Sequence, residues 1–497
     1  MKGLSLASGR RLLAHLALGA LVASFAAIGA ARADSDGISN TGNVPVPAVS
    51  STGLAECPAA KFTPTAFSFD ISWVDKFTRV YLLADRTHGG SASVPGGDVM
   101  VIDLNGINLA SPNSTNQGTT YLTPPNTDPF SGIRCDANAA FGGTTGAGRN
   151  ELTGPNGVFT VNHTEAWLGD GPSSFALAGQ TNTAADYVND KCDSSVRVFN
   201  LITGKQTDHI DVGGCFRSDE GAFDPADQVA LFANPSEQPL AGNAHAGNLN
   251  NSPFITLIST IPVAPGQHHK IIKQINFDGT HGTYAANGGI EQAVYSRKTG
   301  LFYVAVPANS ADGSNGVVAV VDPRGDADDI HVVRNFHVNN CSPNGAALGP
   351  DNELFLGCQV NGEQVIDIRD GHLIRVVAGT AGGCDEVSFN GGDDHFTGAC
   401  TGNGVGGSDA LDVVDADPPK FDLAIDTKTK GAHSVASDPV TVSNFVPAAA
   451  GTGANAGGLC GASPCILIIK STGGDDKSVG QQEATEHHHH HNDNDNN

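Results

Sequence analysis

The sequence is poor in basic residues, in methionine and tryptophan, and in motifs for nucleotide or covalent chemistry. Its 497 residues contain 27 Lys and Arg against 52 Asp and Glu, so the formal charge is −25. No basic stripe is available to neutralise phosphates, which argues against nucleic acid and anionic lipid as partners. A P-loop, a GxSxG elbow, an HExxH helix and a CxxCH haem site are all missing. Hydrophobic residues still form 39% of the chain, enough for a packed core.

Long apolar runs are confined to the N-terminus. Lys2 and the Arg10-Arg11 pair precede an Ala- and Leu-rich stretch over 12–28, and Ala31-Arg32-Ala33 fits a small-residue cleavage site. This pattern predicts an export signal over 1–33, although the apolar stretch alone also resembles a transmembrane anchor. We therefore expect a secreted or periplasmic protein with no membrane insertion after cleavage.

Ten cysteines lie beyond this signal, and no CxxC pair suggests zinc or redox chemistry. An even number of cysteines in an oxidising compartment predicts five disulfides. Two pairs flank turns symmetrically, as residues that face each other in an antiparallel hairpin do. The predicted pairs are Cys341–Cys358 and Cys384–Cys400 from this symmetry, Cys192–Cys215 and Cys460–Cys465 from proximity, and Cys57–Cys135 as the remaining two.

Short β-type segments repeat through the chain, and helical periodicity is nearly absent after the signal. In seven places a polar residue opens an apolar strand, a turn follows, and a second apolar strand comes next, as in Asp70–Asp75 and Val80–Ala84. Third and fourth strands follow most of these hairpins. The fold class predicted is all-β, a seven-bladed β-propeller of four-stranded antiparallel blades, because neighbouring blades must cover each other's faces. An open β-solenoid is the structural alternative.

The repeat also sets the domain organisation. The propeller is expected over 60–472, after an N-terminal extension over 34–59. The last unit lacks a fourth strand, and we expect the segment near Phe62–Phe69 to supply it, so that strands from both termini close the ring. A stretch rich in Asn, Thr, Gly and Pro at about 105–157 is expected to be an insertion that covers one face, or a floppy loop.

The C-terminal segment over 473–497 is rich in His, Asn and Asp and is expected to be disordered. Its five consecutive imidazoles would bind a transition metal such as Ni²⁺, Cu²⁺ or Zn²⁺. An expression tag is the alternative origin of this run. The histidines are His487, His488, His489, His490 and His491.

Two strand openings suggest a family resemblance. They are Asp219–Pro225 (DEGAFDP) and Ser342–Asp351 (SPNGAALGPD). The tandem hairpins resemble secreted seven-bladed propellers of the NHL-like and YVTN-repeat kind, and distantly the calcium-dependent lactonases of the gluconolactonase family. The two openings look like those that supply metal ligands in the lactonases. That resemblance implies a set of Glu, two Asn and one Asp, of which this chain offers one clear matching Asn, Asn344.

The polar residue that opens each innermost strand would lie near one end of the central channel. Carboxylates that converge there must keep protons or bind a cation, and oxygen ligands favour Ca²⁺. His433 widens the choice toward a transition metal, and a solvated, purely structural channel is the alternative. In Asp219-Glu220 and Asp385-Glu386, strand alternation predicts that one side chain of each pair points inward. The predicted metal ligands are Asp70, Glu165, Asp219, Glu291, Asn344, Asp385 and His433.

The ends of the second strands should lie on the same face, where they would form a polar rim for a small ligand such as a sugar or organic acid. The rim candidates are Arg86, His88, Asn234, Asn309 and Gln359. These patterns predict a ligand- or protein-binding module with an acidic, cation-binding mouth. The alternative is a metal-dependent hydrolase or lactonase, in which the ion polarises a carbonyl and a carboxylate activates water.

Overall fold

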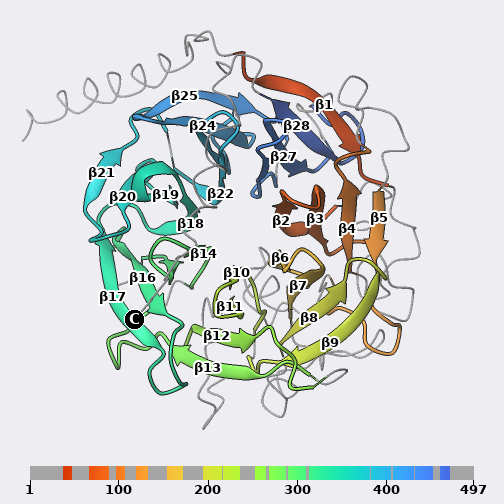
Figure 1. The fold of residues 1–497 in the computed structure, drawn as a ribbon. Coiled ribbons are helices and arrows are strands. Elements are labelled where there is room, and N and C mark those ends of the chain that lie inside the picture. The colour runs from red at the N-terminus through yellow and green to blue at the C-terminus, as the bar shows by residue number, and fades with distance from the viewer. Residues whose placement is uncertain are drawn as a thin grey trace, which may run out of the picture.

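The computed structural model shows a ring of seven four-stranded antiparallel sheets, which confirms the predicted seven-bladed propeller (Figure 1). Among the described residues, the helical content is a single 3₁₀ turn at Pro350–Asn352. The structure describes residues 37–47, 67–88, 97–106, 119–132, 154–171, 194–214, 216–235, 252–264, 268–286, 289–308, 313–380, 382–404, 407–429, 431–450 and 459–470.

In blades 1 to 6 the strands run outward from the ring axis in chain order (Figure 1). Blade 1 contains β2 (Phe69–Asp75), β3 (Val80–Asp85), β4 (Asp98–Asp103) and β5 (Thr119–Leu122). Blade 2 contains β6 (Val158–Val161), β7 (Glu165–Asp170), β8 (Ser195–Asn200) and β9 (Lys205–Asp211). Blade 3 contains β10 (Gly221–Asp224), β11 (Val229–Asn234), β12 (Phe254–Ser259) and β13 (Ile271–Asn276). Blade 4 contains β14 (Ala293–Ser296), β15 (Leu301–Val306), β16 (Gly316–Asp322) and β17 (His331–Val338).

The remaining blades follow the same plan. Blade 5 contains β18 (Pro343–Leu348), β19 (Glu353–Cys358), β20 (Gln364–Asp367) and β21 (Leu373–Val376). Blade 6 contains β22 (Cys384–Asn390), β23 (His395–Cys400), β24 (Ala410–Ala416) and β25 (Pro419–Asp426). Blade 7 contains β26 (Ala436–Asp438), β27 (Ser443–Ala448) and β28 (Cys465–Lys470), and its outermost strand is β1 (Ser39–Pro45).

Blade 7 therefore joins strands from both ends of the chain, as predicted, but the N-terminal strand is not the expected one. β1 pairs with β28 and lies inside the predicted N-terminal extension, whereas Phe69 begins the innermost strand of blade 1. β1 was hard to predict because its sequence, SNTGNVP, is mostly polar, as a strand on the outer edge of the ring can be. Val44 is its buried anchor, packed in a cluster with Ile466 and Ile468.

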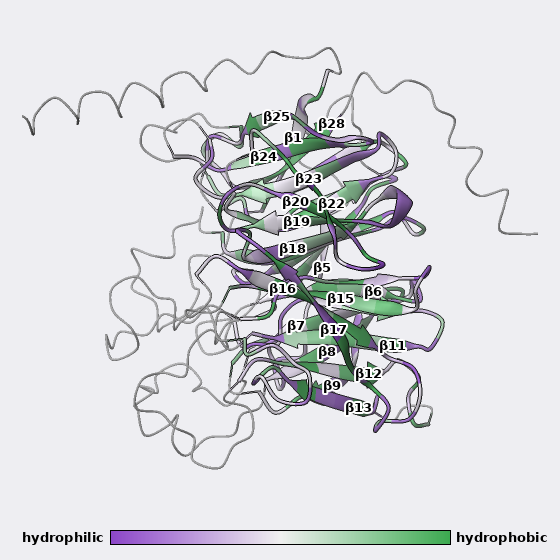
Figure 2. Cartoon of the chain, turned by 90° about the vertical axis from the view of Figure 1, so that its left-hand side faces the viewer, coloured by the Kyte–Doolittle hydropathy of each residue, from purple (hydrophilic) through white to green (hydrophobic). Residues whose placement is uncertain are grey.

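The core lies between the blades, where apolar side chains of neighbouring sheets pack together. Figure 2 shows hydrophobic residues, in green, along many of the strands. One cluster joins Leu231 and Ile255 of blade 3 to Phe302 and Val317 of blade 4. Middle strands are covered on both faces, so β16 reads as a continuous run of Val and Ala with every apolar residue buried. Outermost strands are less covered: β17 mixes buried and exposed residues, and β21 is exposed throughout although three of its four residues are apolar.

Blade 2 differs from the predicted register by one strand. Glu165 opens the second strand, β7, and the innermost strand is β6. Asn162 and His163 adopt positive φ angles of 49° and 58° and close a short hairpin between these two strands. The expected second strand at Ser174–Ala178 lies outside the described residues. Part of the predicted insertion at 105–157 also has a defined place, because β5 is the fourth strand of blade 1.

Three of the five predicted disulfides are present: Cys341–Cys358, Cys384–Cys400 and Cys460–Cys465. Such bonds are typical of an oxidising compartment outside the cytoplasm. Cys57, Cys135, Cys192 and Cys215 lie outside the described residues, as do the predicted signal over 1–33 and the tail over 473–497. Among the helices of the described part, none has the length and apolarity needed to cross a membrane.

Ring closure by β1 leads to a testable prediction. Val44→Asp places an unpaired carboxylate in the cluster between blades 7 and 1, and should lower the free energy of unfolding by about 3 kcal/mol or more. Ser39→Asp on the same strand changes an exposed position and should cost less than about 0.5 kcal/mol. Urea denaturation of both variants measures the difference; equal, small effects would show that β1 does not close the ring.

Candidate functional site

Six of the seven predicted ring residues come together where the innermost strands begin. Successive innermost strands contact each other around the ring, so their first residues surround one axis (Figure 1). Small residues allow the close approach: a Cβ atom on Gly157 would lie 2.1 Å from the Asp219 carbonyl oxygen. We call this group the central polar cluster. Its members are Asp70, Arg86, Asn156, Arg217, Asp219, Glu220, Glu291, Gln292, Asn344, Asp385, Glu386 and His433.

Glu165 is the predicted ligand that does not belong to the cluster. It lies at the hairpin end of β7, away from the start of β6, and its carboxylate accepts a hydrogen bond of 2.9 Å from Trp167 Nε1. Asn156, directly before β6, occupies the equivalent position in blade 2. The assignment of Glu165 as a ring ligand was therefore wrong, because the hairpin of blade 2 was placed one strand too late in the sequence.

Asp70 and Arg86 form a buried ion pair on one side of the cluster. Arg86 follows β3, which runs antiparallel to β2 and brings the end of one strand beside the start of the other. The same guanidinium donates a 2.6 Å hydrogen bond to Asn156 Oδ1, and Asn156 Nδ2 donates to the Ser218 carbonyl at 3.1 Å. Arg86 thereby links the inner ends of blades 1 and 2.

His433 completes the surroundings of Asp70. Its Nε2 lies 3.4 Å from Asp70 Oδ1, and its ring stacks on Phe69 with centroids 4.9 Å apart. Burial lowers the pKa of His433, but the contact with Asp70 outweighs it and raises the pKa above its ordinary value. Burial raises the pKa of Asp70, and the opposing charges of Arg86 and His433 hold it well below its usual range. This side of the cluster is therefore ionised and paired.

Asp219 is bound by a second arginine. Arg217 Nε donates to Asp219 Oδ2, and both residues are buried. Burial nevertheless raises the pKa of Asp219 to about 7, because the attraction of Arg217 is weaker than the cost of desolvation and Asp70 adds repulsion. This carboxyl group is poised between its two protonation states near neutral pH.

Glu220 and Glu386, which come from blades 3 and 6, form a carboxyl pair across the ring. Their side chains hydrogen-bond to each other, and Gln292 Nε2 donates to Glu386 Oε2 at 2.8 Å. Burial raises the pKa of Glu386 to about 8, while burial and the neighbouring Glu386 raise that of Glu220 well above its usual value. Two carboxylates in contact cannot both ionise at low cost, so this pair keeps at least one proton at neutral pH.

The doublets Asp219-Glu220 and Asp385-Glu386 thus correct one prediction. Strand alternation led us to expect one inward side chain per doublet, but both members of each doublet interact within the cluster. The reason is that Asp219 and Glu220 precede β10, where strict alternation does not apply, and that the β22–β23 register shifts between Cys384 and Val387. Asp385 accepts a 3.1 Å hydrogen bond from Asn344 Nδ2.

Several buried oxygen atoms of the cluster have no hydrogen-bond partner among the described residues. They are Ser218 Oγ beside the cluster, Asp219 Oδ1, Glu220 Oε2, Asn344 Oδ1 and Glu386 Oε1. A buried acceptor without a donor costs about 1–3 kcal/mol, so such a concentration marks a place where a proton, a water, a cation or a ligand donor is needed.

The predicted rim residues lie in different surroundings. Arg86 belongs to the cluster itself. His88 is buried and pairs with Asp85 and with the Pro47 carbonyl. Asn234 is buried and accepts from Thr256, whereas Gln359 is exposed and contacts Ser342. Asn309 lies outside the described residues. Of the predicted rim residues that the structure describes, Arg86 alone belongs to the central polar cluster.

Sequence reasoning missed Asn156, Arg217 and Gln292. Asn156 was recoverable, because Asn156-Gly157 precedes an apolar strand and a turn as Asn344-Gly345 does. Arg217 gave no such signal, since a lone arginine in a loop is normally solvated. Gln292 is apparent only from the structure, where its amide spans two blades by donating to Glu386 and accepting from the backbone N–H of Ala346 at 2.6 Å.

A second group of ionisable side chains lies away from the axis. Glu363, Cys384, Cys400 and Asp412 are all buried, and their ligand atoms lie within 4.8 Å of one another. Among the described residues, these four side chains lie close enough together to bind one ion directly. The carboxyl groups of the central polar cluster lie farther from one another. Burial raises the pKa of Glu363 to about 7, and burial together with Glu363 raises that of Asp412 well above its usual value.

An open hollow of about 520 Å³ lies on the outer strands β9 and β13, far from the ring axis in the fold. Histidines line it: His209 pairs with Asp128, and His268 and His269 both pair with Asp208, which leaves His269 Nε2 as a buried atom without a partner among the described residues. We place the candidate site at the central polar cluster, because several buried oxygen atoms without partners lie together there.

Comparisons with known proteins do not assign the chain to a family. No protein-family description and no curated protein matches the sequence. Among solved structures, a chain of the "Crystal Structure of Mitotic Checkpoint Complex" is similar at 8% identity, over 95% of this chain and 97% of that chain, with a TM-score of 0.47. The class of protein shown is thus a β-propeller, as the strand pairing above defines it.

The carboxyl pair predicts a pH dependence of stability. A folded-state pKa raised from about 4.5 to about 8 stabilises the fold below pH 4.5, and this contribution is lost as pH rises through 8. Glu386→Gln keeps the shape of the protonated group. It should therefore raise the free energy of unfolding by about 1–3 kcal/mol at pH 8, and change it little at pH 5, in chelator-treated protein.

Urea denaturation at the two pH values measures this effect. Glu165→Gln is the matched control, because Glu165 is partly exposed and outside the cluster; it should follow the pH dependence of the unaltered protein. A Glu386→Gln variant whose stability falls with pH as steeply as that of the unaltered protein would show that Glu386 is ionised in the fold.

Proposed function

We propose that this propeller is an extracytoplasmic binding module that holds a divalent cation, Ca²⁺ foremost, in an acidic mouth formed by the central polar cluster. A small molecule or a protein binds on the same face. The proposal is supported above all by the buried oxygen atoms of Asp219, Glu220, Asn344 and Glu386 that have no donor among the described residues.

The charge of the cluster supports a cation. Its carboxyl groups belong to Asp70, Asp219, Glu220, Glu291, Asp385 and Glu386. Only Arg86, Arg217 and, when protonated, His433 oppose them. Negative charge therefore remains, and either protons or an ion must compensate it.

The chemistry of the donors favours a hard cation over a transition metal. Apart from His433, which is already engaged with Asp70, the available atoms are carboxylate and amide oxygens. Their spacing is too wide for one direct shell, which suits an ion that keeps part of its water shell and bridges to the carboxylates through it. Ligand groups would then replace these waters on the open side.

A metal-dependent hydrolase or lactonase is the second candidate, and one observation favours it. The Glu220–Glu386 pair holds a proton near neutral pH, as a general acid or base must. A bound ion would polarise an ester or lactone carbonyl beside this pair. Binding remains our first proposal, because the buried oxygen atoms without donors call for a bound ion or ligand whether or not a reaction follows.

The cation proposal predicts a calcium-dependent gain in stability. At a Ca²⁺ concentration 100 times Kd, the free energy of unfolding should rise by about 2.7 kcal/mol at pH 8. Glu291→Gln and Glu386→Gln remove ligand charge and should each abolish most of that gain, whereas Glu165→Gln should keep it. Isothermal calorimetry and thermal denaturation with and without Ca²⁺ measure both effects, and a variant-independent response would place the ion elsewhere.

The same preparations separate binding from catalysis. A screen of lactones and esters with added Ca²⁺ or Mn²⁺ should show no turnover if the protein is a binding module. Hydrolysis that disappears in Glu386→Gln and persists in Glu165→Gln would instead establish the second candidate function. The tail histidines bind transition metals in every variant, so they do not produce this difference.

A further inference from the structure

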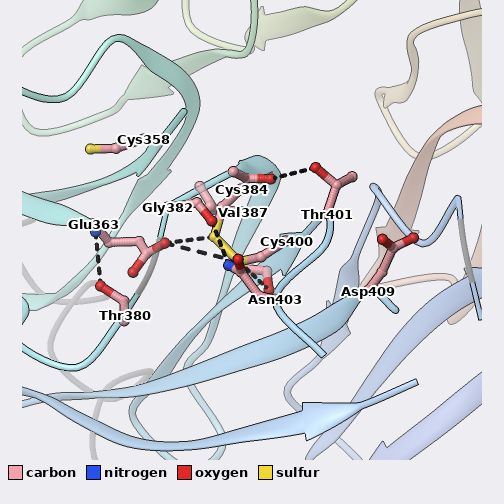
Figure 3. The surroundings of a disulfide bond; sticks show 12 residues. Cys358, Glu363, Thr380, Gly382, Cys384, Val387, Cys400, Thr401, Asn403 and Asp409 are labelled. Atoms are coloured by element: carbon pink, nitrogen blue, oxygen red, sulfur yellow. Dashed lines mark hydrogen bonds between the residues drawn. A yellow bond between two sulfur atoms is a disulfide. The ribbon is translucent and has the colours of Figure 1, made fainter. Parts of the chain in front are cut away.

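The Cys384–Cys400 disulfide lies beside two buried acidic residues that could serve as metal ligands. Figure 3 shows its surroundings. The two cysteines face each other across β22 and β23, and Glu363 reaches them from the neighbouring blade. Asp412 lies on β24, opposite Gly398. The side chains of all four acidic and sulfur residues are buried, and each offers an atom within 4.8 Å of the others.

Gly398 leaves the space in which these groups meet. A Cβ atom at this position would lie 3.2 Å from Cys384 Sγ and 3.3 Å from Cys400 Sγ. The missing side chain thus lets both sulfur atoms pack closely against β23, beside the strand that carries Asp412. A side chain at this position would crowd the two sulfur atoms.

Glu363 is the second, independent indication of a ligand. Its Oε1 lies 2.6 Å from Cys384 Sγ and 3.9 Å from Cys400 Sγ (Figure 3). Its Oε2 has no hydrogen-bond partner in the described chain, although the side chain is completely buried. A disulfide carries neither a proton to donate nor a charge to balance a carboxylate. The oxidised bond therefore leaves this carboxyl group and Asp412 poorly compensated.

Reduction would change that balance. Two thiolate sulfurs and two carboxylate oxygens make four ligands of kinds that Zn²⁺ binds, and Zn²⁺ takes four ligands in a tetrahedral arrangement. We propose that reduction of Cys384–Cys400 creates a buried zinc-type site formed by Cys384, Cys400, Glu363 and Asp412. The protein then has two alternative cross-links between the same strands, one covalent and one through a metal ion.

The chemistry balances with a dithiol as reductant. The disulfide takes two electrons and two protons and becomes two thiols, while the dithiol becomes a disulfide. Binding of the divalent ion then displaces the two thiol protons and any proton on the carboxyl groups. Reoxidation reverses the sequence and releases the ion, so metal occupancy opposes formation of this disulfide.

Cys341–Cys358 provides a matched comparison within the chain. It is also buried and also joins two neighbouring strands, β18 and β19, but no acidic group lies close enough to complete an ion site with it in the described part of the chain. Reduction of that pair should therefore create no four-ligand site.

Co²⁺ is a suitable probe, because bonds to thiolate give charge-transfer absorption that bonds to imidazole do not. The full chain is reduced with a water-soluble phosphine, which is itself oxidised to the phosphine oxide with water as the oxygen source, and then transferred to oxygen-free buffer. Thiol release is verified by alkylation and mass spectrometry, because both cysteines are buried and reduction must be complete.

The reduced protein should bind one Co²⁺ with thiolate charge-transfer bands, and Zn²⁺ should displace it. The oxidised protein and a Cys384→Ser, Cys400→Ser variant should lack these bands, whereas a Cys341→Ser, Cys358→Ser variant should keep them. Glu363→Gln and Asp412→Asn should each weaken binding by about tenfold or more.

Two results would overturn the proposal: no charge-transfer bands in the fully reduced protein, or bands that survive loss of Cys384 and Cys400. The oxidised protein serves as the comparison if the double serine variant does not fold. The tail histidines add equal imidazole binding to every sample and leave the charge-transfer signal unaffected.

Discussion

The burial of carboxyl groups around one axis is the constraint on which the rest of this structure depends. A closed ring needs the innermost strands to contact each other, so residues that open these strands share a small volume whatever their distance in sequence. In this chain those residues are mostly acidic. Apolar packing between blades stabilises the ring enough to hold groups that would otherwise move apart into water.

The repulsion between these carboxyl groups is compensated differently at two places in the cluster. Arg86 and His433 keep Asp70 ionised, because opposite charges in a buried setting outweigh the cost of desolvation. Glu220 and Glu386 instead share a hydrogen bond with each other, and Glu386 accepts one from Gln292. The surroundings of Asp70 are thus a fixed ion-pair network, whereas the Glu220–Glu386 pair can hold a proton or bind an ion.

Most of the ring was predictable from the sequence. Middle strands such as β16 are covered on both faces and consist mainly of Val and Ala, which makes them easy to recognise. The symmetric spacing of cysteines about two turns identified Cys341–Cys358 and Cys384–Cys400. Prediction failed where burial leaves little trace. β1 lies at the outer edge of the ring and its sequence is mostly polar. Glu165 was mistaken for the start of an innermost strand, because the hairpin before it turns at residues with positive φ angles and contains neither Gly nor Pro. Arg217 and Gln292 owe their roles to neighbours from other blades, which no local pattern encodes.

The central claim is that the Glu220–Glu386 carboxyl pair keeps a proton at neutral pH until a cation replaces it. Infrared difference spectroscopy of the chelator-treated protein tests it most directly, because a protonated carboxylic acid and a carboxylate absorb at different frequencies. The account predicts a protonated-acid band at pH 7 that weakens on addition of Ca²⁺ and in a Glu220→Gln, Glu386→Gln variant, while the contribution of Glu363 and Asp412 remains. A protonated-acid band that neither treatment changes would contradict it.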